Sequence, residues 1–160
     1  MVFVPLTASA ALALRAGTPP APLQGFAATP ALRRTLGPES TEDEADFAAL
    51  STAGLAALAG LPGDDGVTAS RRLVLAAEAS DEQVVDLGTH LGEVRLGGLR
   101  WSQVQAVFAD EDEAADLVAA AAGDARGLAL AELLGRPAVA ALSDTHDLLW
   151  YDPSELDALV

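Results

Sequence analysis

The sequence predicts a mixed α/β (α+β) protein. It would hold a single mixed β-sheet of about five or six short strands, with helices packed mainly on one face. Short apolar runs typical of strands recur along the chain, and segments with helical spacing of apolar residues lie between them. Candidate strands 71–77, 93–96 and 104–109 are close in sequence, which favours some antiparallel pairing. The length of 160 residues fits one globular domain over 1–160.

The amino-terminal part alternates short strands with short helices. Residues 2–4 predict a strand, and residues 7–14 predict a short capped helix. Residues 25–29 predict a second strand. Thr29 and Pro30 then begin a helix, because threonine is a good cap and proline at the first helical position loses no hydrogen-bond donor that the helix needs.

The clearest helix covers residues 42–61, where Thr41 and Glu44 have the spacing of a capping box. Gly54 lies inside this pattern and makes a kink or a break possible. The clearest strand covers 71–77, a continuous apolar run that favours a central position in the sheet. The expected apolar stripe of the helix consists of five large side chains: Phe47, Leu50, Leu55, Leu58 and Leu61.

The middle of the chain predicts one more helix and two more strands. Residues 62–66 predict an exposed loop, since proline, glycine and aspartate cluster there. A second capping-box spacing predicts a short helix over 80–87. Residues 93–96 alternate as a half-exposed strand does, and residues 104–109 predict another strand.

The carboxy-terminal third predicts two helices, a strand and a final turn. Asp110 is interpreted as the cap of a helix over 111–122, with further acids in the first turn, where the helix dipole favours them. Residues 127–134 predict a short helix, and residues 148–151 predict the last strand. Asp152, followed by proline, predicts a terminal helical turn.

Charge and composition exclude several classes of function. The net charge of −15 and the lack of any basic stretch beyond two arginine pairs predict no binding to nucleic acid or to an anionic membrane. The chain has no cysteine, so it has neither a disulfide nor a thiol nucleophile. No apolar run approaches the roughly 18 residues of a membrane span, and the amino terminus lacks the basic start of a signal peptide. We therefore expect a cytoplasmic protein.

The residue types that carry chemistry concentrate near the carboxyl terminus. The segment His146–Asp152 contains one of the two histidines, one of the two tryptophans and the single tyrosine. Because neighbouring strand residues face opposite sides of a sheet, one ring of Trp150-Tyr151 should enter the core and the other should be the better candidate for an interface. The residue types of a hydrolase triad also occur nearby, in Ser143, Asp144, His146 and Asp147. Residues so close together in the sequence cannot readily form the geometry of a triad.

A second candidate site lies at the Thr29–Arg34 helix start. A helix amino terminus together with the guanidinium groups of Arg33 and Arg34 offers a place for an anion, although these arginines have many carboxylates to pair with. The two histidines lack metal-ligand spacing and no nucleotide fingerprint occurs, so we expect no metal and no cofactor. The candidate ligand-binding residues are therefore Thr29, Arg33, Arg34, His146, Trp150, Tyr151 and Asp152.

Short stretches along almost the whole chain carry a family resemblance. In order they are residues 2–7, 25–33, 44–50, 71–76, 104–110, 146–152 and 155–156. With these stretches the chain resembles a family of short, acidic, uncharacterised proteins from GC-rich actinobacteria. The resemblance implies a single cytoplasmic α/β domain and no assigned activity, and it is weakest over residues 123–143.

Three functional hypotheses remain open from the sequence. The leading one is a small acidic interaction or accessory protein without catalytic apparatus, with a protein partner or a homodimer as its assembly. The alternative is an anionic-metabolite-binding protein or an enzyme that combines the Thr29–Arg34 helix start with His146–Asp152, using His146, Tyr151 or Asp152 for acid–base work. The third is an acidic mimic that occupies a nucleic-acid-binding partner.

Overall fold

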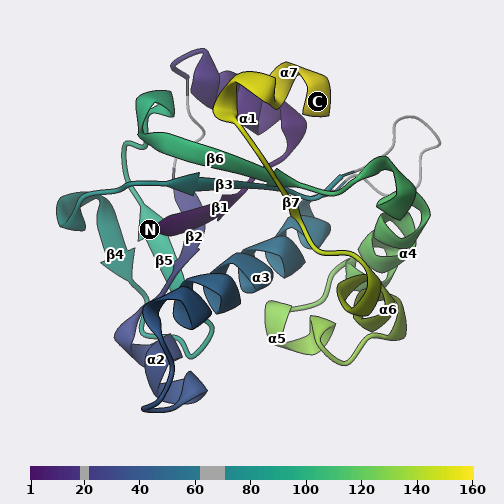
Figure 1. The fold of residues 1–160 in the computed structure, drawn as a ribbon, viewed down its shortest axis with the longest axis horizontal. Coiled ribbons are helices and arrows are strands. Elements are labelled where there is room, and N and C mark those ends of the chain that lie inside the picture. Colours follow the sequence, from purple (N-terminus) through teal and green to yellow (C-terminus); the bar gives the residue numbers. More distant parts are fainter. Residues whose placement is uncertain (19–21, 62–70) are drawn as a thin grey trace.

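A computed structural model describes residues 1–18, 22–61 and 71–160, and in these ranges one seven-stranded sheet forms the centre of the molecule (Figure 1). The strand order is β4-β5-β2-β1-β3-β6-β7. The strands are β1 (Val2–Pro5), β2 (Leu23–Ala27), β3 (Leu73–Ala77), β4 (Val84–Asp86), β5 (Glu93–Leu96), β6 (Val104–Ala109) and β7 (Leu149–Tyr151). The α-helices are α1 (Ala8–Arg15), α2 (Pro30–Leu36), α3 (Glu42–Gly60), α4 (Ala115–Ala125), α5 (Leu130–Leu133), α6 (Pro137–Thr145) and α7 (Leu156–Leu159).

The predicted class is confirmed, with more strands than expected and antiparallel pairing in every recorded ladder. Strands β2 and β3 both run antiparallel to β1, which lies between them, so the two are parallel to each other without being neighbours. The crossover through α2 and α3 therefore skips one strand, as in split β-α-β folds. This arrangement explains why helical connections give no adjacent parallel pair.

Two hydrophobic layers cover the two faces of the sheet. Along β1 and β3 the side chains alternate between the layers: Val2, Val4, Leu73 and Leu75 face α1 and α7, while Phe3 and Val74 face α3. A third cluster joins α3 to α4, α5 and α6 beside the sheet. Most of the helical mass thus lies on the α3 side, as predicted, and two short helices, α1 and α7, cover the opposite face.

Helix α3 has the predicted capping box, and of its predicted apolar stripe Leu55 and Leu58 are buried while Phe47 is not. The Glu44 carboxylate accepts a hydrogen bond from the backbone N–H of Thr41 at 2.7 Å, and Thr41 Oγ1 accepts one from the Glu44 N–H at 3.2 Å. The helix continues through Gly54 without a break. Its sheet-facing side is formed by small residues that let the helix approach closely, and Phe47 is 61% exposed. The buried residues of α3 are Ala45, Ala49, Ala53, Gly54, Leu55, Ala57 and Leu58.

Other elements also differ from the sequence predictions. The predicted helix over 80–87 is wrong: a single 3₁₀ turn, Asp81–Gln83, leads into β4, whose β-branched Val84 and Val85 pair with the edge of β5. Helix α4 continues past Gly123 to Ala125. In residues 123–143, where the family resemblance is weakest, helix α5 is shorter than the predicted helix and α6 has no counterpart among the predicted helices. The predicted loop at 62–66 lies outside the described residues.

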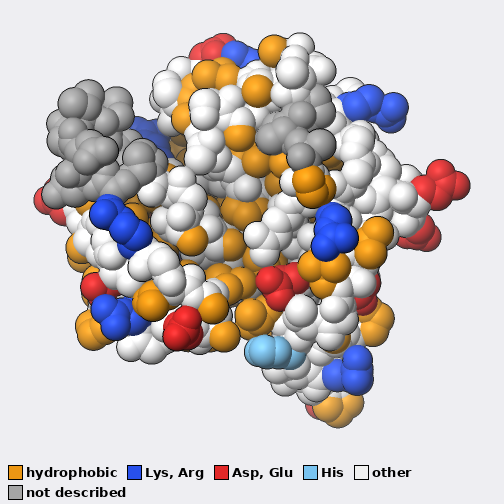
Figure 2. Space-filling view, turned by 180° about the vertical axis from the view of Figure 1, so that it is seen from behind, with side chains coloured by type: hydrophobic (Ala, Val, Ile, Leu, Met, Phe, Trp, Pro, Cys, Tyr) orange, Lys and Arg blue, Asp and Glu red, His pale blue; other side chains and the backbone are white. Residues whose placement is uncertain are grey.

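Charged side chains are mixed on the surface seen from behind (Figure 2). On that face arginines are separated from one another among Asp and Glu, and hydrophobic side chains gather towards its centre. No continuous basic stripe crosses this face. Among the helices that the structure describes, none is long and apolar enough to span a membrane.

Candidate functional site

A buried ion pair fixes the region where β3, β6 and the approach to β7 meet. Arg72 is 5% exposed and Asp110 is fully buried. The Asp110 carboxylate accepts hydrogen bonds from the Arg72 guanidinium, at 2.6 Å from Nη2 and 3.0 Å from Nε, and from the Arg72 backbone N–H at 2.7 Å. Such a pair is stable in a core only when its hydrogen bonds are made, as they are here. The interpretation of Asp110 as a helix cap is therefore wrong.

The ion pair also holds the segment that carries the candidate residues. Arg72 Nη2 donates a further hydrogen bond, at 3.1 Å, to the backbone carbonyl oxygen of His146. The His146 ring is mostly covered, and its Nδ1 lies 2.8 Å from a carboxylate oxygen of Glu111. Nearby, a Cβ on Gly54 would lie 3.1 Å from the Leu148 side chain, so glycine in α3 lets the residue just before β7 pack closely. His146 thus has a structural position next to the buried pair.

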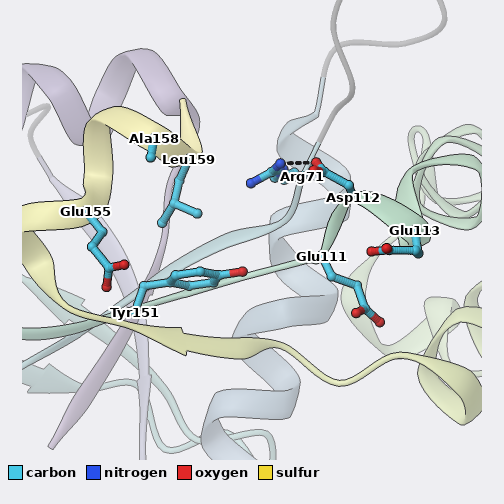
Figure 3. Close-up of a pocket in the computed structure, with 8 residues that line it drawn as sticks. All are labelled: Arg71, Glu111, Asp112, Glu113, Tyr151, Glu155, Ala158 and Leu159. Carbon is cyan, nitrogen blue, oxygen red and sulfur yellow. Dashed lines mark hydrogen bonds and ion pairs between the residues drawn. The ribbon is translucent and has the colours of Figure 1, made fainter.

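An acidic pocket of about 350 Å³ opens beside Tyr151 (Figure 3). The Tyr151 ring lies across it, with its hydroxyl pointing towards Glu111. Arg71 pairs with Asp112 on one side of the pocket. The lining has four carboxylates against one guanidinium, and the lining residues are Arg71, Glu111, Asp112, Glu113, Tyr151, Glu155, Ala158 and Leu159.

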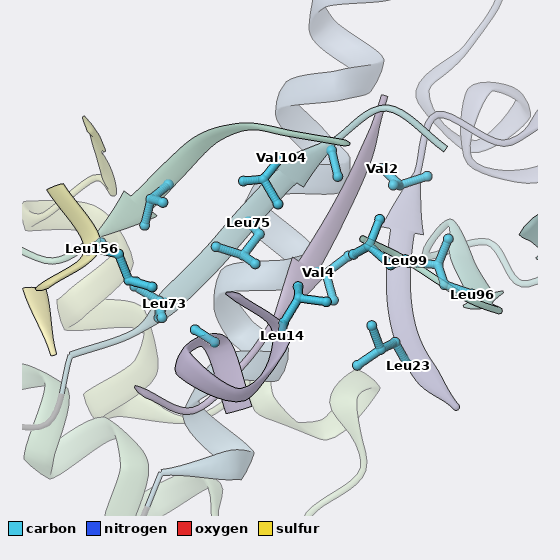
Figure 4. Close-up of a cluster of buried hydrophobic side chains, with 14 of the residues drawn as sticks. Val2, Val4, Leu14, Leu23, Leu73, Leu75, Leu96, Leu99, Val104 and Leu156 are labelled. Carbon is cyan, nitrogen blue, oxygen red and sulfur yellow. The ribbon is translucent and has the colours of Figure 1, made fainter. Parts of the chain in front are cut away.

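The short helix α7 forms one wall of this pocket and is anchored in the core. Leu156 is fully buried and lies beside Leu73 at one end of the cluster drawn in Figure 4. Arg15 of α1 pairs with Asp157 at 2.5 Å, which ties α7 to its neighbouring helix. That hydrogen bond from the Arg15 side chain is the main cause of the lowered pKa of Asp157. The pocket wall is thus held by both apolar and ionic contacts.

The two neighbouring rings of β7 point to opposite faces, as the alternation predicted. Tyr151 is partly buried and packs against the cluster on the α1 and α7 face. Trp150 is 60% exposed and lies opposite Phe108 of β6, on the face where α3 packs. Trp150 is therefore the outward ring, and its neighbour Leu149 is also exposed.

Asp152 caps the turn that follows β7, as predicted. Its carboxylate accepts hydrogen bonds from the Ser154 hydroxyl at 2.6 Å and from the Ser154 backbone N–H at 2.8 Å. The hydroxyl contact is the first cause of the lowered pKa of Asp152, and the backbone contact is the second. Both contacts favour the ionised form, so this residue is a structural carboxylate at neutral pH.

The Thr29–Arg34 segment forms a helix whose amino terminus is already occupied. Thr29 is buried, and its hydroxyl accepts the Leu32 backbone N–H at 3.2 Å. Arg33 and Arg34 belong to the last turn of the short helix α2, but their side chains reach back, and their Nε atoms donate to the carbonyls of Ala28 and Pro30 at its amino-terminal end. They line a separate cavity of about 370 Å³ with Gly37, Pro38 and Ser40. Both guanidinium groups thus bond to backbone carbonyls near the start of α2, where the Thr29 side chain already accepts the Leu32 N–H.

The two predicted sites also do not meet. Arg33 donates Nε to the Ala28 carbonyl at 3.1 Å and lies 3.7 Å from Glu42 through Nη2. Its cavity and the Tyr151 pocket share no lining residue. An active centre built from both segments has no support in this geometry. Among the described residues, no cluster of three or more Asp, Glu or His side chains is arranged to hold a metal ion.

Sequence reasoning missed the residues that organise the carboxy-terminal site. The sequence predicts no site role for Arg71, Arg72 or Glu111, yet they contact segments far along the chain. One signal was present: an aspartate directly after the buried strand β6 and an arginine directly before the buried strand β3. Because those strands pair with Leu73 opposite Ala109, the two charges meet at one sheet end.

Fold and site together define a small acidic α/β protein whose last strand is an exposed sheet edge beside a carboxylate-lined pocket. The sequence matches the model of a family over residues 1–160, and the chain belongs to that family, DUF6912, a family of unknown function. No curated protein matches the sequence. No solved structure matches it either.

Proposed function

We propose that this protein is a small acidic interaction or accessory protein that works in the cytoplasm by binding another protein. The observation that carries the proposal is Trp150, a large aromatic side chain left 60% exposed on the last strand of the sheet. Tryptophan is enriched at the energetic centres of protein interfaces, since it buries a large area when a partner covers it. Leu149, on the opposite face of the same strand, is 43% exposed, so β7 has an exposed apolar side chain on each face.

The charge supports a basic partner. A net charge of −15 steers a positively charged protein towards this chain and opposes the approach of a second copy. The same charge supports an acidic mimic that covers a nucleic-acid-binding protein, as one form of this interaction. A homodimer has to overcome the repulsion between two such chains.

The test is capture from a cell extract followed by reconstitution with the identified partner. Wild-type protein and Trp150→Ser are compared with Val85→Ser, a matched control at an exposed apolar position on β4, the other edge strand. We expect a purified partner to bind the wild type and the control, and to bind Trp150→Ser on the order of tenfold or more weakly. Equal binding to all three proteins, or no partner at low salt, refutes the proposal.

Anion binding is the second candidate, and the cavity at Arg33 and Arg34 favours it. The side-chain Nε atoms of both arginines donate to backbone carbonyls, which holds the guanidinium groups in place. A thermal-shift screen with inorganic phosphate, nucleotides and phosphorylated metabolites tests this candidate. A ligand at a hundred times its dissociation constant stabilises the fold by about 2.7 kcal/mol, and Arg33→Gln should abolish the shift. A flat response across the panel rejects anion binding.

A further inference from the structure

The last strand of the sheet has an open edge. Strand β7 pairs with β6, with Ala109 opposite Leu149 and Val107 opposite Tyr151, and no other described strand lies beyond it. An edge strand directs backbone N–H and C=O groups away from its neighbour, where another extended chain can pair with them. Natural edges are commonly blocked by proline, by charge or by short length; the three residues of β7 include neither proline nor charge, and Asp152 and Pro153 follow directly after them.

The two faces of β7 differ in chemistry. On one face Trp150 lies opposite Phe108, beside the layer that packs against α3. On the other face the Tyr151 ring crosses the acidic pocket (Figure 3). Side chains of a strand added along this edge would also alternate between the faces. One set would lie beside an exposed tryptophan, and the next would lie beside the acidic pocket.

The acidic face selects positive charge. Arg71 is engaged by Asp112, which leaves carboxylates of the pocket, among them Glu113 and Glu155, without a cation in the recorded ion pairs of the described residues. A guanidinium or ammonium group entering here meets these carboxylates and the edge or face of an aromatic ring, and both contacts favour a cation. The apolar face selects an uncharged side chain for the same strand.

The net charge decides between a second copy and a different chain. Two copies would bring charges of −15 together, and this chain offers no basic segment that could enter the partner copy's pocket at its described edge strands. A basic segment from another protein meets complementary charge instead.

From these observations we infer that β7 binds an extended segment of a partner protein, in which arginine or lysine alternates with apolar residues. The segment adds as a further strand to the sheet. Its apolar side chains cover Trp150, and a cationic side chain enters the pocket beside Tyr151. This inference rests on the proposed function and names the partner's recognition element.

The test uses three synthetic peptides of seven residues with blocked ends. The first alternates arginine with valine, the second alternates arginine with proline, and the third alternates glutamate with valine. The second has the charge of the first but disfavours a regular strand, because proline lacks the backbone N–H and holds φ near about −65°, far from the roughly −140° of an antiparallel strand. Binding is followed by Trp150 fluorescence in a Trp101→Phe background, and amide hydrogen exchange of residues 149–151 is measured on the wild type in parallel.

We expect the arginine–valine peptide to bind on the order of tenfold more tightly than the arginine–proline peptide, or better. Its binding should also shift Trp150 emission to the blue and slow amide hydrogen exchange in β7. The glutamate–valine peptide should not bind. Trp150→Ser and Tyr151→Leu should each weaken binding, whereas Val85→Ser should leave it unchanged; titration calorimetry measures these variants, because Trp150→Ser removes the fluorescent residue.

Equal binding of the two arginine peptides, or unchanged exchange in β7, overturns the inference, because charge alone would then explain the affinity. Absence of binding by all three peptides at low salt overturns it as well. These failures are distinct from failure of the proposed function. A purified partner that still loses affinity for Trp150→Ser keeps the interaction role while ruling out this mode of recognition.

Discussion

Replacing Asp110 by asparagine separates two explanations of one residue. Asparagine caps helices about as well as aspartate, so a capping role predicts almost no loss of stability. In the structure Asp110 is fully buried and bonded to Arg72, which is 5% exposed. Removing one partner of a buried pair leaves an uncompensated charge and costs about 3–5 kcal/mol. We expect Asp110→Asn to lower the free energy of unfolding by that amount.

Urea unfolding followed by circular dichroism measures this change. With a slope of about 2 kcal/mol per molar urea, a loss of about 4 kcal/mol moves the midpoint down by about 2 M. Asp112→Asn is the matched control, because the Asp112 side chain is 80% exposed in its pair with Arg71 and such pairs contribute about 1 kcal/mol at most. The double variant Arg72→Met/Asp110→Leu should recover much of the loss, since neither charge is then left unpaired.

Equal midpoints for Asp110→Asn and Asp112→Asn would refute this reasoning. The buried pair would then contribute no more than a surface pair, and the cap would be the better explanation of Asp110. A large loss in Asp110→Asn that the double variant fails to recover would show that packing around the pair matters more than its charge.

Three further changes test other parts of the fold. Thr29→Ala should cost about 1 kcal/mol by uncapping α2 while Thr29→Ser costs less, and thermal unfolding compares them. Gly92→Ala should lower the free energy of unfolding in urea clearly more than Gly88→Ala. Both glycines have positive φ (+77° and +70°), but only at Gly92 would the new Cβ lie 2.5 Å from the Ala27 carbonyl oxygen. Equal losses would contradict this. The lowered pKa of Asp152 gives stability that is present above its unfolded value of about 4 and is lost as the pH falls through the folded value. The difference in melting temperature between wild type and Asp152→Asn should therefore shrink between pH 6 and pH 3, and a constant difference would contradict it.

Much of the local structure could be predicted from the sequence because its signals are local. The caps Thr7, Thr29, Thr41 and Asp152 each bond to a residue two or three positions away, so spacing alone reveals them. The strands at β1, β3 and β6 carry continuous or alternating apolar runs. The outcome for Trp150 and Tyr151 also followed from local geometry, because strand side chains alternate.

The failures share one cause, which is that a distant partner changes the meaning of a local pattern. The segment 80–87 has a capping-box start, but the open edge of β5 pairs with Val84–Asp86 and turns them into a strand. Phe47 fits a helical stripe, but the sheet is approached by alanines because they allow closer packing. The Thr29 cap forms as expected, but the Nε atoms of Arg33 and Arg34 are already bonded to the carbonyls of Ala28 and Pro30, which spacing along the chain does not reveal.

By itself the sequence determined the class of fold, the caps, the acidic surface charge and the alternation of the two rings in the last strand. These follow from contacts within a few residues and from composition. Only the tertiary structure decided that Asp110 is half of a buried ion pair, that Tyr151 lies across an acidic pocket and that β7 is an open edge. Each of these depends on strand order and register, which bring together residues far apart in the sequence, such as Arg71 and Tyr151. Spacing along the chain carries no direct record of such neighbours.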